Sequence, residues 1–427
     1  MYREVLNTLS EWKEKENRKP LLLKGAKGVG KSYTLKDFGM GYFENSAIFD
    51  FKEQEYVKSL FVREKDPEKI IKMLGVTSGE NMIPGETFIA FENVDFLPEA
   101  EEIIKFIIDN MSEYHIAFTV SVNEEEYLSK EIIQRFEIIG MYPLNFSEFL
   151  IVNKESKLSE AIKAIGRQAL TEEELEKVQE YLKLYMIIGG MPKVVKVYVN
   201  TQDMVEVETA KSKLLMGLMN QIDAIEDATL KGKVSQIWNS LAAQLEKDNK
   251  KFQYGAVKLT ARAREYEEGL KWLIYHKYVH LLYKMKDEKS GINGEFNNKS
   301  FRVFYNDIGI MSSVMGVTDN DIDVNNIQKL HNGALALQLV FGELNSNKNV
   351  QNMCYWNSDG LSKIDFLFKD QKRMVPVVLD LSNNKKAQSI KVYKDTFKPP
   401  MIIKVTSWQM DIKESTLGIP VYSLWNL

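Results

Sequence analysis

One eight-residue loop carries the clearest chemistry in the sequence. It reads Gly25-Ala26-Lys27-Gly28-Val29-Gly30-Lys31-Ser32 and fits the pattern G-x-x-x-x-G-K-[ST]. Glycines let backbone N–H groups curl around a phosphate, the Lys31 ammonium can reach the β and γ oxygens, and the Ser32 hydroxyl can ligate Mg²⁺. The loop predicts a site for ATP and Mg²⁺. The alternative, a glycine turn that binds nothing, requires its position between an apolar strand and a helix to be coincidental.

A second carboxylate site should follow a later apolar strand, where an acid orients Mg²⁺ and a neighbouring Glu activates water. Phe88-Ile-Ala-Phe-Glu92-Asn93-Val94-Asp95 fits best. Glu92 falls where an Asp is usual and is, with Ser32, the candidate metal ligand; its alternative role is that of an ordinary surface acid. Asn93 falls where the catalytic Glu is usual, and an amide cannot take a proton. Asp95 could substitute, but we expect its side chain to point elsewhere. The pattern therefore predicts impaired hydrolysis.

These residues need an open α/β sheet to position them. Between Arg18 and Met141, compact apolar runs alternate with helical spacing, as in a parallel sheet covered on both faces. The predicted strands are Leu21–Leu23, Ala47–Phe51, Phe88–Phe91, Ile116–Val120 and Phe136–Ile139. The predicted helices are Ser32–Phe43, Pro67–Leu74 and Ala100–Met111.

After Pro143 the pattern becomes helical, with a capping box at Thr171 and Glu174 and a break at Gly189. Helices followed by two strands around a polar tip then predict a winged helix. Residues 319–427 have the pattern of an α+β domain with two strands after its last helix. The predicted divisions are 1–150 (ATP-binding), 151–225 (helical connector), 226–318 (winged helix) and 319–427 (α+β).

Composition limits the classes of function. The 427 residues carry a formal charge of −4, which excludes a uniformly basic nucleic-acid coat. The one cysteine excludes an internal disulfide, and four scattered histidines make a metal cluster improbable, although His276 and His280 share a helical face. No apolar run reaches the ~18 residues of a membrane span, and the charged N-terminal helix is unlike a signal peptide. We expect a cytoplasmic protein that does not use a membrane.

Several segments together resemble a known family. The order RKPLLLKGAKGVGKS, TFIAFENVDF, YHIAFTVSV and IIQRFEIIGMYPLNFSEFL is similar to AAA-superfamily P-loop ATPases of bacteria and archaea. Similarity continues through YLKLYMIIGGMPKVV, FRVFYNDIGIM, GALALQLVFGEL and KIDFLF, and so covers essentially the whole chain. The resemblance implies an ATPase core, a helical connector, a winged helix and a restriction-endonuclease-like C-terminal domain of unknown function. It also implies sensor roles for Thr119, Ser121 and Asn123, and a sensor or finger role for Arg135, whose alternative is a solvated charge.

The resemblance places a degenerate nuclease site in the terminal domain. Asp365 stands at the first acid position and Asp380 at the second, but Ser382 replaces the usual lysine two residues later. Leu337 stands where a helical Glu is usual, although Glu343 is kept. Migration of Lys363, Lys385 or Lys386 into the site is the alternative to a catalytically silent fold.

Cations in the expected winged helix are candidates for contacts with DNA phosphates: Lys251, Lys258, Arg262 and Arg264. Glu265, Glu267 and Glu268 weaken this stripe, so a solvated helix face or a contact between domains remains open. The leading interpretation is a slow ATPase acting as a nucleotide-dependent switch on DNA. A non-catalytic scaffold working through protein partners is the second, and an ATP-gated nuclease the third; oligomerisation is left open.

Overall fold

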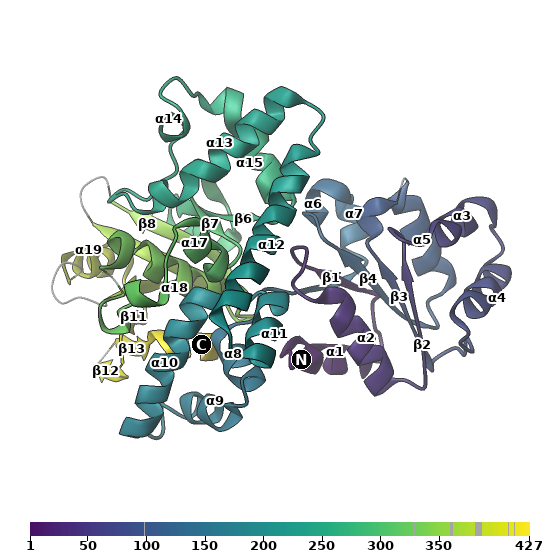
Figure 1. Ribbon diagram of the computed structural model, residues 1–427, viewed down its shortest axis with the longest axis horizontal. Coiled ribbons are helices and arrows are strands. Elements are labelled where there is room, and N and C mark those ends of the chain that lie inside the picture. The colour runs from purple at the N-terminus through teal and green to yellow at the C-terminus, as the bar shows by residue number, and fades with distance from the viewer. Residues whose placement is uncertain (98, 328, 359–361, 381–386, 409, 414) are drawn as a thin grey trace. The chain divides into compact units, whose positions relative to one another are not determined.

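The computed structural model describes residues 1–427 apart from 98, 328, 359–361, 381–386, 409 and 414 (Figure 1). The chain separates into two units. The first comprises Met1–Tyr142 and Tyr275–Tyr278, and the second comprises Pro143–Ile274 and Val279–Leu427. The finer division of the residues beyond 150 into three domains stays a prediction.

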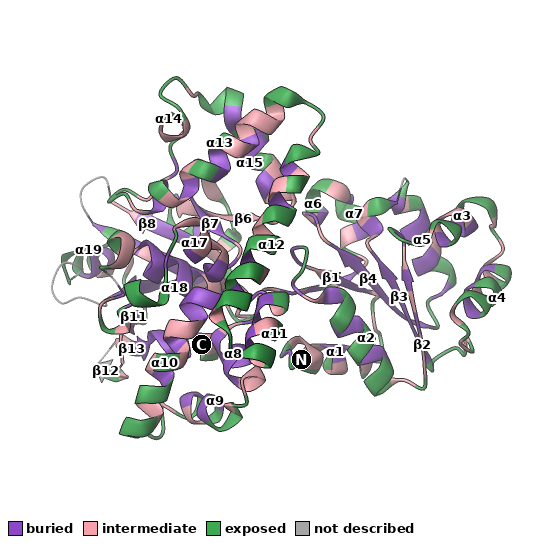
Figure 2. Ribbon diagram, viewed as in Figure 1, coloured by how far each residue is buried: buried purple, intermediate pink, exposed green. Residues whose placement is uncertain are grey.

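The first unit is built on a sheet of five parallel strands in the order β2-β3-β4-β1-β5. These strands are β1 (Leu21–Lys24), β2 (Asn45–Asp50), β3 (Thr87–Glu92), β4 (His115–Val120) and β5 (Glu137–Gly140). All five predicted strands are confirmed. Every residue of β3 and β4 is buried (Figure 2), as continuous apolar runs covered on both faces require.

Helices connect these strands and supply the rest of the core. They are α1 (Val5–Lys13), α2 (Lys31–Tyr42), α3 (Glu55–Arg63), α4 (Pro67–Ser78), α5 (Ala100–Asn110), α6 (Glu124–Tyr127) and α7 (Lys130–Ile133), with a 3-10 helix η1 (Val94–Phe96) after β3. Phe91 stacks between Phe49 and Phe118 across three adjacent strands. Because this packing holds the sheet rigid, the loops at its carboxyl edge have fixed anchors.

The second unit begins with a run of helices, as predicted. They are α8 (Phe146–Val152), α9 (Ser156–Lys163), α10 (Glu172–Ile188), α11 (Pro192–Thr201), α12 (Met204–Asp223), α13 (Ala228–Leu245), α14 (Tyr254–Val257) and α15 (Ala263–Tyr275). Thr171 and Glu174 form the predicted capping box. Gly189 ends α10 with φ +76°, and Pro192 opens α11 in its first turn.

An eight-stranded sheet follows, in the order β12-β13-β11-β10-β9-β8-β6-β7. Its strands are β6 (Val279–Met285), β7 (Phe296–Tyr305), β8 (Gln351–Asn357), β9 (Lys363–Asp370), β10 (Arg373–Leu379), β11 (Ile402–Thr406), β12 (Asp411–Lys413) and β13 (Thr416–Pro420). The associated helices are α16 (Glu288–Asn293), α17 (Ile308–Val314), α18 (Ala334–Ser346) and α19 (Ala387–Phe397).

Two details of this sheet differ from the sequence expectation. The polar tip between β6 and β7 contains the short helix α16, which Asp287 caps by accepting from the Ser290 backbone N–H. Three strands follow α19 where two were predicted, because the short β12 pairs antiparallel with β13. The β6–β7 hairpin joins the terminal strands through parallel pairing of β6 with β8, so one sheet spans both segments.

Among the described residues, no helix is both long and apolar enough to cross a membrane.

Candidate nucleotide site

The phosphate loop joins the end of β1 to the start of α2. Gly28 and Gly30 have φ of +88° and +98°, a conformation that L-residues with a side chain adopt rarely. A Cβ at Gly25 would lie 2.2 Å from the Met141 carbonyl oxygen, so this position accepts only glycine. The remaining loop residues divide between interior and solvent: Ala26 and Val29 are buried, and Lys27 is exposed. The glycines therefore let the loop fold closely against the edge of the sheet.

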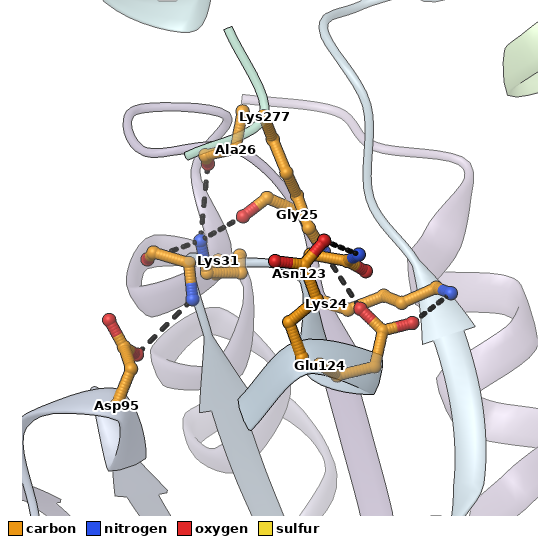
Figure 3. A network of polar contacts seen from close by, with 10 residues as sticks. Lys24, Gly25, Ala26, Lys31, Asp95, Asn123, Glu124 and Lys277 are labelled. Carbon is orange, nitrogen blue, oxygen red and sulfur yellow. Dashed lines mark hydrogen bonds and ion pairs between the residues drawn. The ribbon is translucent and has the colours of Figure 1, made fainter. Parts of the chain in front are cut away.

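Lys31 lies inside this loop (Figure 3). Its Nζ donates to the carbonyl oxygens of Gly25 (2.7 Å) and Ala26 (3.1 Å) and to Ser121 Oγ (2.9 Å). Burial and, to a smaller extent, the positive charge of Lys277 lower the pKa of Lys31 to about 7, against the opposing effect of Asp95 and Glu92. A phosphate would offer this ammonium stronger acceptors than neutral carbonyls do.

Ser32 and Glu92 come together as the sequence predicts for a metal site. Their side chains are hydrogen bonded to each other, and Glu92 is buried at the end of β3. Burial raises the pKa of the Glu92 carboxyl. The hydrogen bond from Ser32 opposes this rise, and the negative charge of Asp50 adds to it. Within the described residues, Glu92 Oε1 is buried without a hydrogen-bond partner. A hydroxyl and a carboxylate are hard oxygen ligands, so this pair fits Mg²⁺.

Asn93 is held by two neighbours on adjacent strands. It adopts φ 57° and ψ 48°, its backbone N–H donates to Thr119 Oγ1 (3.0 Å), and its side-chain Nδ2 donates to Asp50 Oδ1 (2.8 Å). Asp50 lies at the end of β2, in register with Glu92. Sequence reasoning missed Asp50, although a carboxylate near the end of a predicted apolar strand was an available signal.

The polar residues at the end of β4 are split in their contacts. Thr119 and Ser121 reach Asn93 and Lys31, as described above. Asp95 Oδ1 accepts from the Ser121 backbone N–H (3.2 Å), so its side chain lies near the phosphate loop instead of pointing away from it. Asn123 turns elsewhere: its backbone N–H donates to the Tyr275 carbonyl (2.7 Å) and its side chain to Glu126. Two of the three expected sensor residues thus line the candidate site.

Arg135 lies after α7 and pairs with Asp109 of α5. The guanidinium is about one-third exposed. No hydrogen bond or ion pair among the described contacts joins Arg135 to the phosphate loop, so its sensor or finger role stays a prediction.

A buried ion-pair network, which the sequence did not suggest, lies beside Lys31. Glu124 is almost fully buried and pairs with Lys24 of β1 and with Lys277 (3.0 Å) from the segment Tyr275–Tyr278 (Figure 3). Burial raises the pKa of Glu124, but the two lysines outweigh it and leave that pKa lowered. Because Glu124 and Lys277 are 153 positions apart in the sequence, the local pattern gave no signal for this contact.

In the second unit, the expected nuclease acids lie on neighbouring strands. Asp365 of β9 accepts from the Leu379 backbone N–H through Oδ2 (3.3 Å). Asp380, just after β10, pairs with Lys404 of β11 (3.3 Å). Ser382 lies outside the described residues, as do Lys385 and Lys386. A lysine therefore stands beside Asp380, but it comes from a strand that the sequence analysis did not consider.

Glu343 has a different set of partners from these acids. Its Oε1 accepts from the Phe146 backbone N–H (3.0 Å) and from the Tyr185 hydroxyl (3.1 Å), and Leu337 is a core residue. Lys363 donates to the Asp248 carbonyl (3.4 Å). Among the described residues, no group of three or more His, Cys, Asp or Glu could hold a metal ion.

The candidate DNA-binding cations surround the start of α15. Lys258, Arg262 and Arg264 are exposed, and Lys251 is half-buried. Arg264 is close to Glu265 at 4.0 Å, so part of its charge is compensated. Lys258 and Arg262 precede the helix, on the segment that leads into it.

Two family models match the chain. Residues 17–150 match the AAA domain, and residues 179–321 match a domain of unknown function. No curated protein matches.

Solved structures similar to this chain include three archaeal or bacterial proteins. The Walker-type ATPase PABY2304 of Pyrococcus abyssi is 14% identical with a TM-score of 0.46, over 73% of this chain and 95% of that one. The Aeropyrum pernix ORC1 protein in complex with DNA is 12% identical with a TM-score of 0.31, over 74% of this chain and 91% of that one. The Thermotoga maritima RuvB Holliday junction branch migration motor is 14% identical with a TM-score of 0.31, over 66% of this chain and 89% of that one.

The parallel sheet, the phosphate loop and the family match agree on the class of the first unit. Residues 17–150 form an AAA-type P-loop domain, a class that binds nucleotide. The ATPase part of the expected resemblance is thereby confirmed, and the winged helix and endonuclease-like parts stay predictions.

Proposed function

We propose that this protein binds ATP with Mg²⁺ at Gly25–Ser32, hydrolyses it slowly, and uses nucleotide state as a switch acting on DNA. The observation that carries the proposal is the meeting of Lys31, Ser32 and Glu92 at one edge of the sheet. They combine a buried cation, a hydroxyl and an unpartnered carboxylate oxygen.

Each of these groups has a definite task in the proposed site. Backbone N–H groups of the loop and of the first turn of α2 face the phosphates, where the helix dipole favours negative charge. Lys31 exchanges its carbonyl partners for phosphate oxygens. Ser32 and Glu92 hold Mg²⁺, which when bound neutralises charge on the phosphate oxygens. Thr119 accepts from the backbone N–H of Asn93 after β3, and Ser121 accepts from Lys31, so both residues hold groups of the proposed site.

Slow turnover is proposed because Asn93 cannot accept a proton. We expect a rate below about 1 s⁻¹, the lower end of the ordinary enzyme range. The switch is proposed to act through residues 226–318, with the exposed cations Lys258 and Arg262 in contact with DNA phosphates. The order α13-α14-α15-β6-β7 supports a winged helix there.

A non-catalytic scaffold is the second candidate, and the amide at position 93 favours it because Asn93 cannot accept a proton. For the terminal segment, the order α18-β8-β9-β10-α19-β11 supports an endonuclease-like fold: three antiparallel strands, a helix and a strand parallel to β10. Nuclease activity is the least favoured candidate, since Ser382 stands where the lysine of such a site is usual.

Calorimetry with ATP and Mg²⁺ tests the binding proposal. Lys31→Ala should weaken binding by about 1.5–3 kcal/mol, the contribution of one hydrogen bond to a charged group. Lys27→Ala is the matched control, because it removes an exposed lysine of the same loop and keeps the backbone. Equal affinities of the wild type and Lys31→Ala would refute the proposed site.

A further inference from the structure

The proposed site lacks its usual proton acceptor at position 93, yet a carboxylate lies beside that position. Asp50 ends β2, the strand next to β3, and parallel register brings it beside Glu92 at the carboxyl edge of the sheet. Nothing in the phosphate-loop pattern marks Asp50, because it stands 42 residues before Glu92 in the chain.

The contacts of Asp50 tie it to the phosphate site. Its Oδ1 accepts from Asn93 Nδ2 (2.8 Å) and from the Lys52 backbone N–H (2.8 Å), and its own N–H donates to Gln54 Oε1 (2.9 Å). These three hydrogen bonds, two accepted and one donated by Asp50, hold this half-buried residue in one place. The charge of Asp50 also contributes to the raised pKa of Glu92. Since Glu92 is hydrogen bonded to Ser32, Asp50 belongs to the same cluster as the phosphate loop.

We propose that Asp50 is the proton acceptor for the attacking water, and that Asn93 is a positioning residue that holds the Asp50 carboxylate. The inference rests on the proposed ATP site and deepens it by naming the group that carries the slow turnover. The carboxylate is on β2, and the residue after β3 supplies an amide donor to it.

The step balances without a further reactant. The water oxygen bonds to the γ-phosphorus as the bond from that phosphorus to the β,γ-bridging oxygen breaks, and ADP leaves with the bridging oxygen. The water proton passes to Asp50 and then to the released phosphate or to solvent, which restores the carboxylate.

Asp95 is the competing acid and has a different environment. Its Oδ1 accepts from the Ser121 backbone N–H, and its negative charge raises the pKa of Lys31. A carboxylate beside an ammonium is a counterion for that ammonium. Asp50 instead contacts the side chain that stands where the base is usual, which is why we assign the role to Asp50.

Single-turnover hydrolysis of labelled ATP, together with calorimetric binding of ATP and Mg²⁺, tests the assignment. Asp50→Asn should bind nucleotide within threefold of the wild type and lose about 10²-fold or more in rate, as expected for a general base. Asp66→Asn is the matched control: Asp66 is a half-buried carboxylate of the same unit that caps α4, and asparagine caps equally well. Asp95→Asn removes the counterion of Lys31 and should lose less of the rate than Asp50→Asn does.

An exchange variant separates the chemical role from a folding defect. Asp50→Asn combined with Asn93→Asp keeps an amide–carboxylate pair and returns the acid to position 93, where aspartate tolerates the left-handed backbone as asparagine does. Its rate should recover at least tenfold over Asp50→Asn. The acid limb of its pH–rate profile should also differ from that of the wild type, which a purely structural role would not cause.

The outcomes distinguish the inference from the proposal beneath it. A wild type that binds no ATP would overturn both. Binding without measurable turnover, an Asp50→Asn rate equal to that of the wild type, or a loss confined to Asp95→Asn would overturn the inference and leave the ATP site standing. An exchange variant no faster than Asp50→Asn would overturn the role assigned to the pair.

Discussion

Glu343 should make the second unit less stable as the pH rises through neutrality. This residue of α18 is fully buried; its Oε1 accepts two hydrogen bonds, and its Oε2 is buried with no hydrogen-bond partner in the described part of the chain. Burial raises the pKa of Glu343 from an ordinary value of 4.5 to about 8, although the hydrogen bonds from Phe146 and Tyr185 lower it. Glu148 of α8 adds a like charge that favours the neutral acid.

A raised folded-state pKa fixes the sign of the effect. The folded protein keeps its proton on Glu343 up to about pH 8, whereas the unfolded chain loses it near pH 4.5. The stabilisation is therefore complete below pH 4.5 and is lost as the pH rises towards 8. Between pH 6 and pH 8 the folded state binds up to one more proton than the unfolded state, so the free energy of unfolding should fall by about 2 kcal/mol.

Urea unfolding of the wild type and Glu343→Gln at pH 6 and pH 8 measures this loss. Glutamine keeps an oxygen that accepts from Phe146 and Tyr185 but does not titrate, so the variant should lack the 2 kcal/mol fall. Titrations shared by both proteins cancel in the difference. Tryptophan fluorescence reports mainly on the second unit, which holds five of the six tryptophans: Trp238, Trp272, Trp356, Trp408 and Trp425.

The control is Glu267→Gln, which changes an exposed glutamate of the same unit that pairs with Lys271. It should follow the wild type at both pH values. Parallel pH dependence of the wild type and Glu343→Gln would refute the reasoning, since it would mean that Glu343 does not change its proton occupancy on unfolding.

Four further predictions follow from the geometry. Because the pKa of Lys31 is about 7, ATP binding at pH 7 should take up about half a proton, seen as a buffer-dependent calorimetric enthalpy that Lys31→Arg abolishes. Gly25→Ala should destabilise the first unit by at least about 1–3 kcal/mol in thermal unfolding, since its Cβ meets a backbone carbonyl. Lys258→Ala and Arg262→Ala should each reduce the salt dependence of DNA affinity by about one unit of slope, and an unchanged slope would exclude their phosphate contacts. Plasmid incubated with Mn²⁺ should stay intact; nicking that is lost in Asp380→Ala would contradict a silent terminal domain.

The sequence predicted those features that depend on neighbouring residues. Apolar runs located all five strands of the parallel sheet, because strands buried on both faces need continuous apolar residues. The capping box at Thr171 and the break at Gly189 were also predicted, since caps and left-handed glycines act within a few residues. The meeting of Ser32 and Glu92 followed from placing a loop and a strand end at the same sheet edge.

The features that the sequence did not predict depend on strand order and long-range pairing. The Lys24–Glu124–Lys277 network joins residues far apart in the chain, and Lys404 reaches Asp380 only because β11 pairs parallel with β10. The side chain of Asp95 was expected to point elsewhere, but η1 turns the chain after β3 and brings Asp95 to Ser121. No pattern of spacing could have specified these contacts before the order of the strands was known.

The same reasoning applies to the chemistry of the AAA-type domain. A linear motif assigns the base to the residue after Glu92 and finds asparagine, which predicts a weak or inactive site. A parallel sheet, however, brings the carboxyl ends of its strands to one edge, so the carboxylate at the end of β2 lies beside the residue that follows β3. The side chain of Asn93 donates a hydrogen bond to that carboxylate, so position 93 still contributes to the proposed site. If Asp50 is the proton acceptor, as we propose, the carboxylate that is missing after β3 is replaced by one at the end of the neighbouring strand.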